Sequence, residues 1–378
     1  MPDADNSHTD IPRPSKPTRL VSLDAFRGLT VIGMIFMDHP TIREAVPLWL
    51  LHPDWHGFRL ADTIFSSFLF IAGVSMAFSA AKRAADPSAE RSAFARRMLL
   101  LIALGFAVNL VKYGIPLRVF GVLQRIALAS LIAWPFRRRG PWLPLTVGLG
   151  FITVHTLVLQ FAGAPGIPAG YLDGIHNISG WIDTHLVGLA HTYKGQGFDP
   201  EGALSTLTAS SMVLLGLSVG QWLRRYPKDP RMLRRLAGLA LASFVCGLAL
   251  SIAIPINKKL GTGSFTLIMW GIDIAVLAAL YWLADVRGHT RWLRPIVPLG
   301  LNALGIYVGF NILLGIVMHI TITTPGGTDI SLFRAIGAAA ERIIGDPTAA
   351  TLSVSALEVL AWLAVATALD RRRIYFKL

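Results

Sequence analysis

Long apolar segments alternate with short polar connections along the chain. A helix that spans a bilayer needs about 20 mostly apolar residues. Ten segments satisfy this requirement, at residues 20–38, 60–81, 94–111, 117–136, 142–162, 203–223, 236–256, 264–284, 296–320 and 350–369. The pattern predicts an all-α fold, a polytopic membrane helix bundle of about ten transmembrane helices. We expect the polar, proline-rich residues 1–19 to form a disordered cytoplasmic tail.

The composition supports a membrane protein and excludes several other classes. Hydrophobic residues make up 53% of the 378-residue chain, charged residues make up 15%, and the mean hydropathy is +0.55. Because soluble domains usually carry about 25% charged residues, we exclude a soluble fold, a disordered chain and a disulfide-stapled scaffold. Cys246 is the only cysteine, so an internal disulfide, a cysteine zinc site and a dithiol redox centre are excluded as well.

The basic residues are distributed unevenly between alternate connections. Of the 35 lysines and arginines, 24 fall in the two termini and in the connections on one side, and nine fall in the opposite connections. The remaining two, Arg27 and Arg125, are assigned to predicted spans and not to connections. The positive-inside rule then places both termini in the cytoplasm and exports residues 39–59, 163–202 and 321–349. This asymmetry accounts for the net charge of +13 without a nucleic-acid partner.

Polar side chains at membrane depth are the candidates for chemistry, because burying them there is costly and usually functional. They form two groups by depth. The outer group contains Asp38, His52, Asp54, Asp62 and Lys258, with Gln124 and Arg125 somewhat deeper; the inner group contains Asp24, Arg27 and Asn302. Two such groups in one bundle favour a ligand pathway that opens at both sides of the bundle. The alternative is structural ion pairing between helices, such as Arg125 with Asp273 or Glu358.

The most unusual stretch is His52-Pro53-Asp54-Trp55-His56-Gly57, which we place in a short loop at the outer face. It has three interpretations. One is a metal site that uses both histidines with Asp38 or Asp54, although Pro53 disfavours the helix that a His-x-x-x-His spacing suits. Another is an interfacial aromatic belt. We favour the third, a catalytic loop in which a carboxylate orients a histidine base, and we expect no metal.

Several motifs resemble the heparan-α-glucosaminide N-acetyltransferase family. They occur in order between about residues 19 and 320 and are Ser22-Leu-Asp-Ala-Phe-Arg-Gly-Leu-Thr30, the loop from His52 to Gly57, Ala61-Asp62, Phe68-Leu-Phe-Ile-Ala-Gly-Val-Ser75, Arg118-Val-Phe-Gly-Val-Leu-Gln-Arg125, Phe198-Asp-Pro-Glu-Gly202, Ile256-Asn-Lys-Lys-Leu260 and Gly300-Leu-Asn-Ala-Leu304. Each piece is weak alone, but the ordered set is specific. One departure is Asp38, which stands where the family commonly has asparagine.

The resemblance implies a transmembrane acyltransferase domain over residues 20–370, followed by a basic cytoplasmic tail over 371–378. Family members take acetyl-CoA from the cytoplasm and transfer the acetyl group to the amino group of a glucosamine on the other side. They are usually homodimers, and the bacterial relatives are inner-membrane proteins. We therefore expect a multi-pass protein of the bacterial inner membrane, which acts on a small or cell-wall amino sugar with periplasmic delivery of the acetyl group.

The family's active-site histidine corresponds to His52, which we take as the general base. Asp38 or Asp62 would orient its imidazole. The residues expected to bind the sugar are Asp54, Trp55, Gln124, Arg125, Asn257 and Lys258. The residues expected to bind acetyl-CoA are Asp24, Arg27 and Asn302, since arginine suits bidentate contact with phosphate. Direct transfer and an acetyl-histidine intermediate both remain open.

Two other functional classes are compatible with the pattern. A secondary transporter of an amino sugar typically has ten or more spans with intramembrane charges. A non-catalytic membrane partner would tolerate replacement of His52. The enzyme would consume acetyl-CoA, whereas the transporter would move its solute without it.

Overall fold

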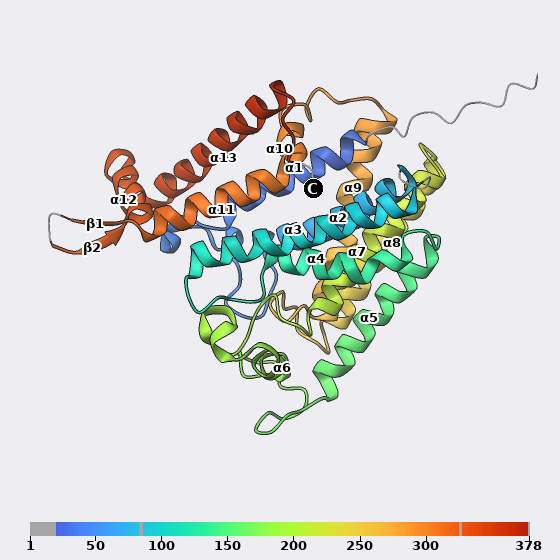
Figure 1. The fold of residues 1–378 in the computed structure, drawn as a ribbon, viewed down its shortest axis with the longest axis horizontal. Coiled ribbons are helices and arrows are strands. Elements are labelled where there is room, and N and C mark those ends of the chain that lie inside the picture. The colour runs from blue at the N-terminus through green and yellow to red at the C-terminus, as the bar shows by residue number, and fades with distance from the viewer. Residues whose placement is uncertain (1–19, 83–85, 325–326, 377–378) are drawn as a thin grey trace, which may run out of the picture.

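The computed structural model describes residues 20–82, 86–324 and 327–376, and this part of the chain is almost entirely helical (Figure 1). Its helices are α1 (Val21–Met37), α2 (Thr63–Lys82), α3 (Pro87–Tyr113), α4 (Val122–Ala133), α5 (Trp142–Phe161), α6 (Ile178–Val187), α7 (Thr206–Arg225), α8 (Pro230–Leu250), α9 (Gly263–Tyr281), α10 (Val297–Leu301), α11 (Ala303–His319), α12 (Leu332–Ile344) and α13 (Pro347–Arg371). Two short strands, β1 (Thr321–Thr323) and β2 (Asp329–Ser331), pair in antiparallel fashion.

Seven helices in the described ranges are long and apolar enough to cross a membrane. These are α2 with the turn before it, α3, α5, α7, α8, α9 with the π-turn after it, and α13. The all-α polytopic prediction is thus confirmed, but the count of ten spans is not. The remaining three predicted spans correspond to shorter helices: α1 has 17 residues, α4 has 12, and Asn302 separates α10 from α11.

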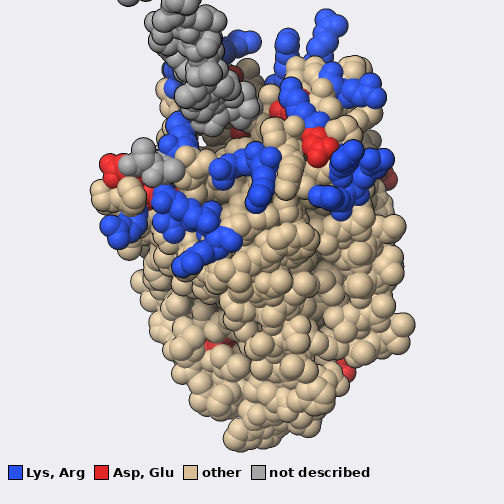
Figure 2. Space-filling model, turned by 90° about the vertical axis from the view of Figure 1, so that its right-hand side faces the viewer, with Lys and Arg blue, Asp and Glu red and all other residues tan. Residues whose placement is uncertain are grey.

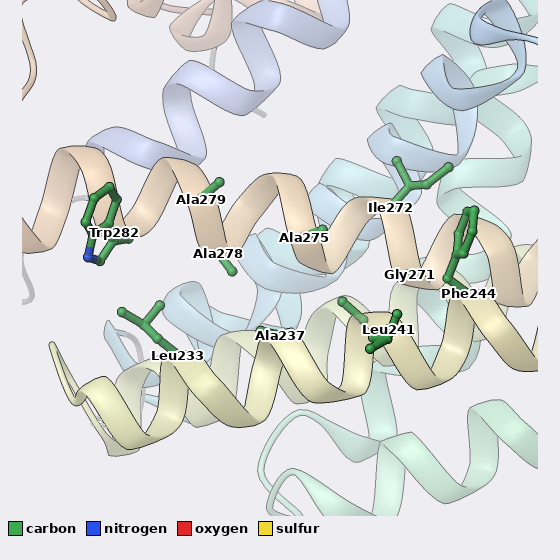
Figure 3. A pocket seen from close by; sticks show the side chains of 11 residues that line it. Leu233, Ala237, Leu241, Phe244, Gly271, Ile272, Ala275, Ala278, Ala279 and Trp282 are labelled. Carbon is green, nitrogen blue, oxygen red and sulfur yellow. The ribbon is translucent and has the colours of Figure 1, made fainter.

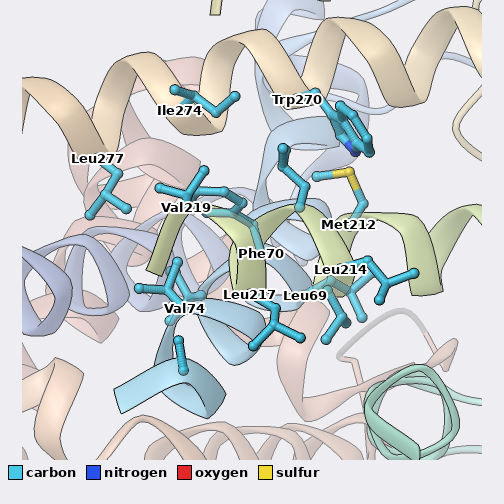
Figure 4. Packing of buried hydrophobic residues seen from close by; sticks show 14 of the residues in the cluster. Leu69, Phe70, Val74, Met212, Leu214, Leu217, Val219, Trp270, Ile274 and Leu277 are labelled. Carbon is cyan, nitrogen blue, oxygen red and sulfur yellow. The ribbon is translucent and has the colours of Figure 1, made fainter. Parts of the chain in front are cut away.

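The core of the bundle is built around α7, whose residues are almost all buried. Figure 4 shows α7 between α2 and α9, with Phe70, Leu217 and Trp270 among the packed side chains. A Cβ atom at Gly73 of α2 or at Gly216 of α7 would collide with the backbone of the other helix. These glycines therefore allow the two helices to approach backbone to backbone, as small residues do in membrane bundles.

The connections contain more structure than the apolar pattern indicates. Residues 163–202 carry α6 and two short 3₁₀ turns. Residues 321–349 hold the β1–β2 hairpin and the amphipathic helix α12. The hairpin was not predicted, because strands of three residues are too short to display an alternating pattern.

Lysine and arginine side chains gather at one end of the face shown in Figure 2, and the rest of that face is mostly uncharged. The first helix begins at Val21, and the backbone N–H groups of Val21 and Ser22 donate to Asp285 in the π-turn after α9. Which side of the membrane this end faces remains a prediction. The predicted disordered tail over 1–19 lies outside the described residues.

Candidate functional site

The loop between α1 and α2 presents His52 beside the start of α2. Its backbone turns at Pro53 and at Gly57, where φ is +120°, a value that glycine adopts without strain. Arg59 closes the loop: its guanidinium donates to the carbonyl of His52 at 3.3 Å, and its backbone N–H donates to Asp62 Oδ2 at 2.9 Å. The loop therefore places His52 close to Asp62, although ten positions separate them.

The outer polar cluster consists of His52, Asp38, Asp62 and Lys258. His52 Nδ1 lies 2.7 Å from Asp62 Oδ1, and His52 Nε2 lies 3.7 Å from Asp38 Oδ1. Lys258 Nζ is 3.3 Å from Nδ1 and 3.5 Å from Nε2 of the same ring. The side chain of Asp62 is 1% exposed, whereas that of His52 is 32% exposed. The structure thus brings together four members of the predicted outer group, with the imidazole open to a ligand and its carboxylate partner buried.

The charges of this cluster act on the imidazole in opposite directions. Burial and the Lys258 ammonium lower the pKa of His52, but the carboxylates of Asp38 and Asp62 outweigh them and raise it above its ordinary value. Burial alone would raise the pKa of Asp38, yet the neighbouring imidazoles lower it. Asp38 therefore carries its charge beside His52. A histidine whose imidazole is oriented by a carboxylate is suited to general base catalysis.

The hydrogen bond to Asp62 also selects the tautomer of His52. A carboxylate can only accept, so Nδ1 carries the proton that is shared with Asp62. The lone pair of the neutral ring then lies on Nε2, on the side of Asp38. This is the arrangement in which a buried carboxylate holds an imidazole ready to take a proton at its other nitrogen.

Three other predicted loop residues hold the loop in place. The Trp55 indole donates to the carbonyl of Leu172 at 2.7 Å. His56 Nε2 lies 2.8 Å from Asp173 Oδ1, and its Nδ1 lies 3.2 Å from the amide of Asn257. These contacts fasten the loop to the 163–177 connection and to the α8–α9 connection. The Asp54 side chain is exposed, and its carbonyl accepts from Lys259.

The two histidines of the loop do not converge. His52 bonds to Asp62, whereas His56 bonds to Asp173. Within the described residues, no three histidine, cysteine, aspartate or glutamate side chains are grouped as ligands for a metal ion. The loop geometry thus does not support the metal interpretation of the His-x-x-x-His spacing.

A second buried network lies under the α6–α7 connection. Arg118 donates to Asp199 through Nε, at 2.8 Å from Oδ2, and through a terminal nitrogen, which also contacts Glu201. Burial opposes ionisation of Glu201, but the guanidiniums of Arg118 and Arg125 lower its pKa. Arg118, Asp199 and Glu201 lie in motifs that carry the resemblance, but no role was predicted for them. The sequence signal for these residues is the Asp-x-Glu-Gly run in the 163–202 connection.

Two predicted sugar-binding residues, Arg125 and Gln124, lie next to this network. Arg125 donates to Ser205 Oγ and to the carbonyl of Gly202 at 3.1 Å. The alternative pairing of Arg125 with Asp273 or Glu358 is wrong, because Asp273 accepts from Ser67 at 2.6 Å and, among the described residues, Glu358 has no ion-pair partner. Both polar atoms of the buried Gln124 amide have no hydrogen-bond partner in the described part of the chain.

His39, next to Asp38, was missed by the sequence analysis. Its Nε2 lies 3.3 Å from Lys112 Nζ, which also donates to Asn311 Oδ1 at 3.1 Å. Burial and the Lys112 charge lower the pKa of His39 to about 4. His39 is therefore neutral at physiological pH and keeps the Lys112 ammonium next to the Asp38 carboxylate.

An inner cavity of about 230 Å³ opens beside the predicted acetyl-CoA residues. Arg27 lines it and donates to Ser75 Oγ at 2.8 Å, to the carbonyl of Gly300 at 3.2 Å and to Asp24 at 3.2 Å. The rest of the lining is mostly apolar, includes a second arginine, Arg97, and comes from α2, α3, α4, α10, α11 and the C-terminal residues. A mostly apolar space with two arginines in its wall fits a long, thin ligand that carries a phosphate head.

The predicted residue Asn302 lies behind the wall of this cavity. It is fully buried, and its side-chain oxygen accepts from the backbone N–H of Phe376 at 3.2 Å. The Phe376 ring packs on Gly305 and lines the cavity. Tyr307 of α11 also lines the cavity. The lining thus includes Arg27 of α1 and Tyr307 of α11, but no residue of the outer polar cluster.

Comparisons with known proteins agree with the motifs. The family model described as heparan-alpha-glucosaminide N-acetyltransferase, catalytic, matches residues 19–175. The human heparan-alpha-glucosaminide N-acetyltransferase is 26% identical over 366 residues, which cover 78% of this chain and 53% of the human protein. The mouse protein of the same name is 27% identical over 363 residues, which cover 80% and 54% respectively. The chain thus spans about half the length of the curated relatives it matches, and the resemblance predicted from the motifs is confirmed.

Proposed function

We propose that this multi-pass membrane protein, a relative of the heparan-alpha-glucosaminide N-acetyltransferases, is an acyltransferase. It would move the acetyl group of acetyl-CoA to the amino group of a glucosamine-type sugar. The observation that carries the proposal is the hydrogen bond of the partly exposed His52 to a buried carboxylate, Asp62, in the same bundle as a mostly apolar cavity that Arg27 lines. An acetyltransferase needs both features, a base at the acceptor and a passage for a long thioester arm.

The inner cavity supports acetyl-CoA as the donor. Arg27 and the basic connections near it would contact the phosphates of the nucleotide head. The mostly apolar lining suits the uncharged pantetheine arm. Along α1, Asp38 lies roughly 16 Å beyond Arg27. The pantetheine arm is about 15–20 Å long, the rise of roughly ten residues of helix, so its length matches this distance. The thioester would then reach the outer polar cluster.

The transfer step follows from the geometry of His52. The sugar amine attacks the thioester carbonyl, a C–N bond forms, and the C–S bond breaks to release CoA as a thiolate, which then takes up a proton. The amine proton passes to Nε2 of His52, while Asp62 holds Nδ1–H and favours the imidazolium that results. The Lys258 ammonium, 3.3 Å from Nδ1, would lower the pKa of the imidazole that takes this proton. Direct transfer and transfer through acetyl-histidine use the same atom, Nε2.

The acceptor would bind on the side of the outer polar cluster. Trp55, His56 and Asn257 use their polar atoms to hold the loop in place. We therefore assign recognition of the sugar to Asp38, Glu201 and Lys258. Asp38 and Glu201 are acidic and would attract the amino group of the sugar before it loses its proton. Periplasmic delivery, the bacterial inner membrane and the homodimer remain predictions from the resemblance and from the distribution of basic residues.

A single assay tests the proposal. The purified protein in detergent is mixed with acetyl-CoA and glucosamine, and free CoA and N-acetylglucosamine are measured. We expect both products in equal amounts, and none from glucose, which lacks the amine. In proteoliposomes, acetyl-CoA supplied on one side and glucosamine on the other should still give product. Glucosamine flux without any consumption of acetyl-CoA would overturn the proposal in favour of a transporter.

A further inference from the structure

An apolar groove of about 580 Å³ runs along the outer surface of the α8–α9 pair, away from the proposed active site. Five residues of α8, from Leu233 to Phe244, form one wall, and five residues of α9, from Gly271 to Ala279, form the other together with Trp282 of the following π-turn. Figure 3 shows Leu233 and Trp282 at one end of the groove and Phe244 and Gly271 at the other. Along α8 the groove is roughly 16 Å long, enough for most of a fatty-acyl chain.

The shape of the groove comes from small residues on one face of each helix. Ala237 of α8 and Ala275, Ala278 and Ala279 of α9 recur at the helical period and leave the space open. At Gly271 the helices touch, because a Cβ atom there would collide with Phe244. The groove is therefore closed at its floor by helix packing and open to the lipid.

Unpartnered arginines surround the Leu233–Trp282 end of the groove. Arg234 lies on the same face of α8 as Ala237 and Leu241, and Arg231 and Arg235 flank it. The Arg287 guanidinium stands 5.0 Å from the centre of the Trp282 ring. In the described part of the chain, none of these four exposed arginines pairs with a carboxylate.

The acidic residues near this end are already engaged with backbone groups. Asp229 accepts from the N–H of Arg231 at 2.8 Å, and Asp285 accepts from Val21 and Ser22. Among the described residues, the arginines at this end outnumber the carboxylates, so the local charge of the groove end is positive.

The energetics identify what kind of lipid this arrangement selects. An acyl chain gains no hydrophobic free energy when it moves from bulk lipid into an apolar groove, because lipid tails are as apolar as leucine. Selection must come from the headgroup, and basic residues at a membrane surface attract anionic lipids. We propose that the α8–α9 groove binds an anionic phospholipid, with an acyl chain along the alanines and the phosphate on Arg234 and Arg287.

Quenching of tryptophan fluorescence by brominated acyl chains tests this proposal. The full-length protein is placed in phosphatidylcholine nanodiscs that contain a minor fraction of dibrominated phosphatidylglycerol or, in parallel, of dibrominated phosphatidylcholine. The signal of Trp282 is the difference between the wild type and Trp282→Phe. We expect dibrominated phosphatidylglycerol to reach half-maximal quenching at a mole fraction on the order of fivefold lower than dibrominated phosphatidylcholine does. A single arginine near the membrane surface attracts an anionic headgroup by about 1 kcal/mol, which corresponds to this factor.

Two paired variants separate a site from general surface charge. Arg234→Gln with Arg287→Gln should abolish the preference for phosphatidylglycerol. Arg91→Gln with Arg96→Gln removes the same charge from exposed positions of α3 and should leave the preference intact. Ala275→Leu with Ala279→Leu should fill the groove and reduce quenching by both lipids.

Three results would overturn the proposal. Equal quenching by the two lipids would show that the headgroup is not selected. Equal loss of the preference in both arginine pairs would reduce the effect to general surface charge. Trp282 shielded from both lipids, together with a dimer that the groove-filling variant converts to a monomer in light scattering, would show that a second copy of the chain occupies the groove.

Discussion

The outer polar cluster and the inner cavity lie in one bundle but are built in different ways. The outer cluster is held by side chains from separate connections: His52, Asp62 and Lys258 contact one another within 3.7 Å. The inner cavity is shaped by helix packing, and most of its lining is apolar. Gly28 and Gly300 let α1 and α10 touch behind Arg27, where a Cβ atom would collide with the backbone of the other helix.

This difference indicates which properties each region controls. In the outer cluster a single lost charge changes the protonation of the imidazole, so the effects should appear in turnover and in its pH dependence. In the inner cavity a lost side chain changes the fit of a ligand, so the effects should appear in the apparent affinity for acetyl-CoA. Four variants, taken from the largest expected effect to the smallest, test this division.

The largest effect is expected from His52→Ala. Removal of the base should lower turnover by roughly 10²–10⁴-fold while acetyl-CoA binding remains nearly unchanged, which steady-state kinetics and equilibrium binding will measure. His56→Ala is the matched control in the same loop and should be much milder, because His56 contacts Asp173 and Asn257 rather than the reacting atoms. Full activity of His52→Ala would refute the catalytic assignment.

The next largest effect is expected from Asp62→Asn. Loss of orientation should reduce turnover by up to roughly 10²-fold. The base must be neutral, so the rate rises as the pH passes the pKa of His52. The carboxylates raise that pKa, so removing one charge should move the rise to lower pH. The exposed carboxylate of the same loop provides the control: Asp54→Asn should leave the profile in place, and an unmoved profile in Asp62→Asn would contradict the proposed pairing.

Arg27→Ala should change affinity rather than chemistry. Loss of a charged contact with phosphate should raise the KM for acetyl-CoA by roughly tenfold, with little change in kcat or in the KM for the sugar. Arg96→Ala, an exposed arginine of α3 outside the cavity lining, should change neither constant. An equal rise of both KM values, or loss of folded protein, would instead make Arg27 a structural partner of Asp24 and Ser75.

The smallest effect on rate is expected from Lys258→Gln. This variant also tests the direction in which the pH profile of the rate shifts. The Lys258 ammonium lowers the pKa of His52, so its removal should move the pH profile to higher pH, opposite to Asp62→Asn. At neutral pH we expect a few-fold lower turnover, because a larger share of His52 is protonated. Lys259→Gln, whose ammonium contacts Trp55 and the Asp54 carbonyl, should leave the profile unchanged. Shifts in the same direction for Lys258→Gln and Asp62→Asn would show that these charges do not act on one imidazole.

Much of the outer polar cluster could be predicted from the membrane depth of its residues, which follows from their positions relative to the ends of the apolar segments. Asp38 and Asp62 end and begin apolar segments, and His52 lies in the connection between them, so all three had to lie near one face. Lys258 follows from the same argument on a later connection. The structure brings these four together because the position of a residue along a membrane-spanning helix determines its depth.

Other placements depend on contacts that sequence position does not encode. Asn302 shares the depth of Arg27, yet it faces the C-terminal residues and not the cavity lumen, since rotation about a helix axis is set by packing. Arg118 and Asp199 are 81 positions apart and pair only after the α6–α7 connection folds over α4. The same limit applies to Trp55 and Asn257, which we predicted to bind the sugar: their contacts that fasten the loop were not predicted.

The position of Phe376 has a practical consequence for handling the protein. The last described residue packs on Gly305 and forms part of the cavity wall. A bulky group attached to the chain directly after Phe376 would act on the proposed donor passage through this ring. Preparations with and without such a group should therefore be compared before kinetic constants are assigned to the enzyme.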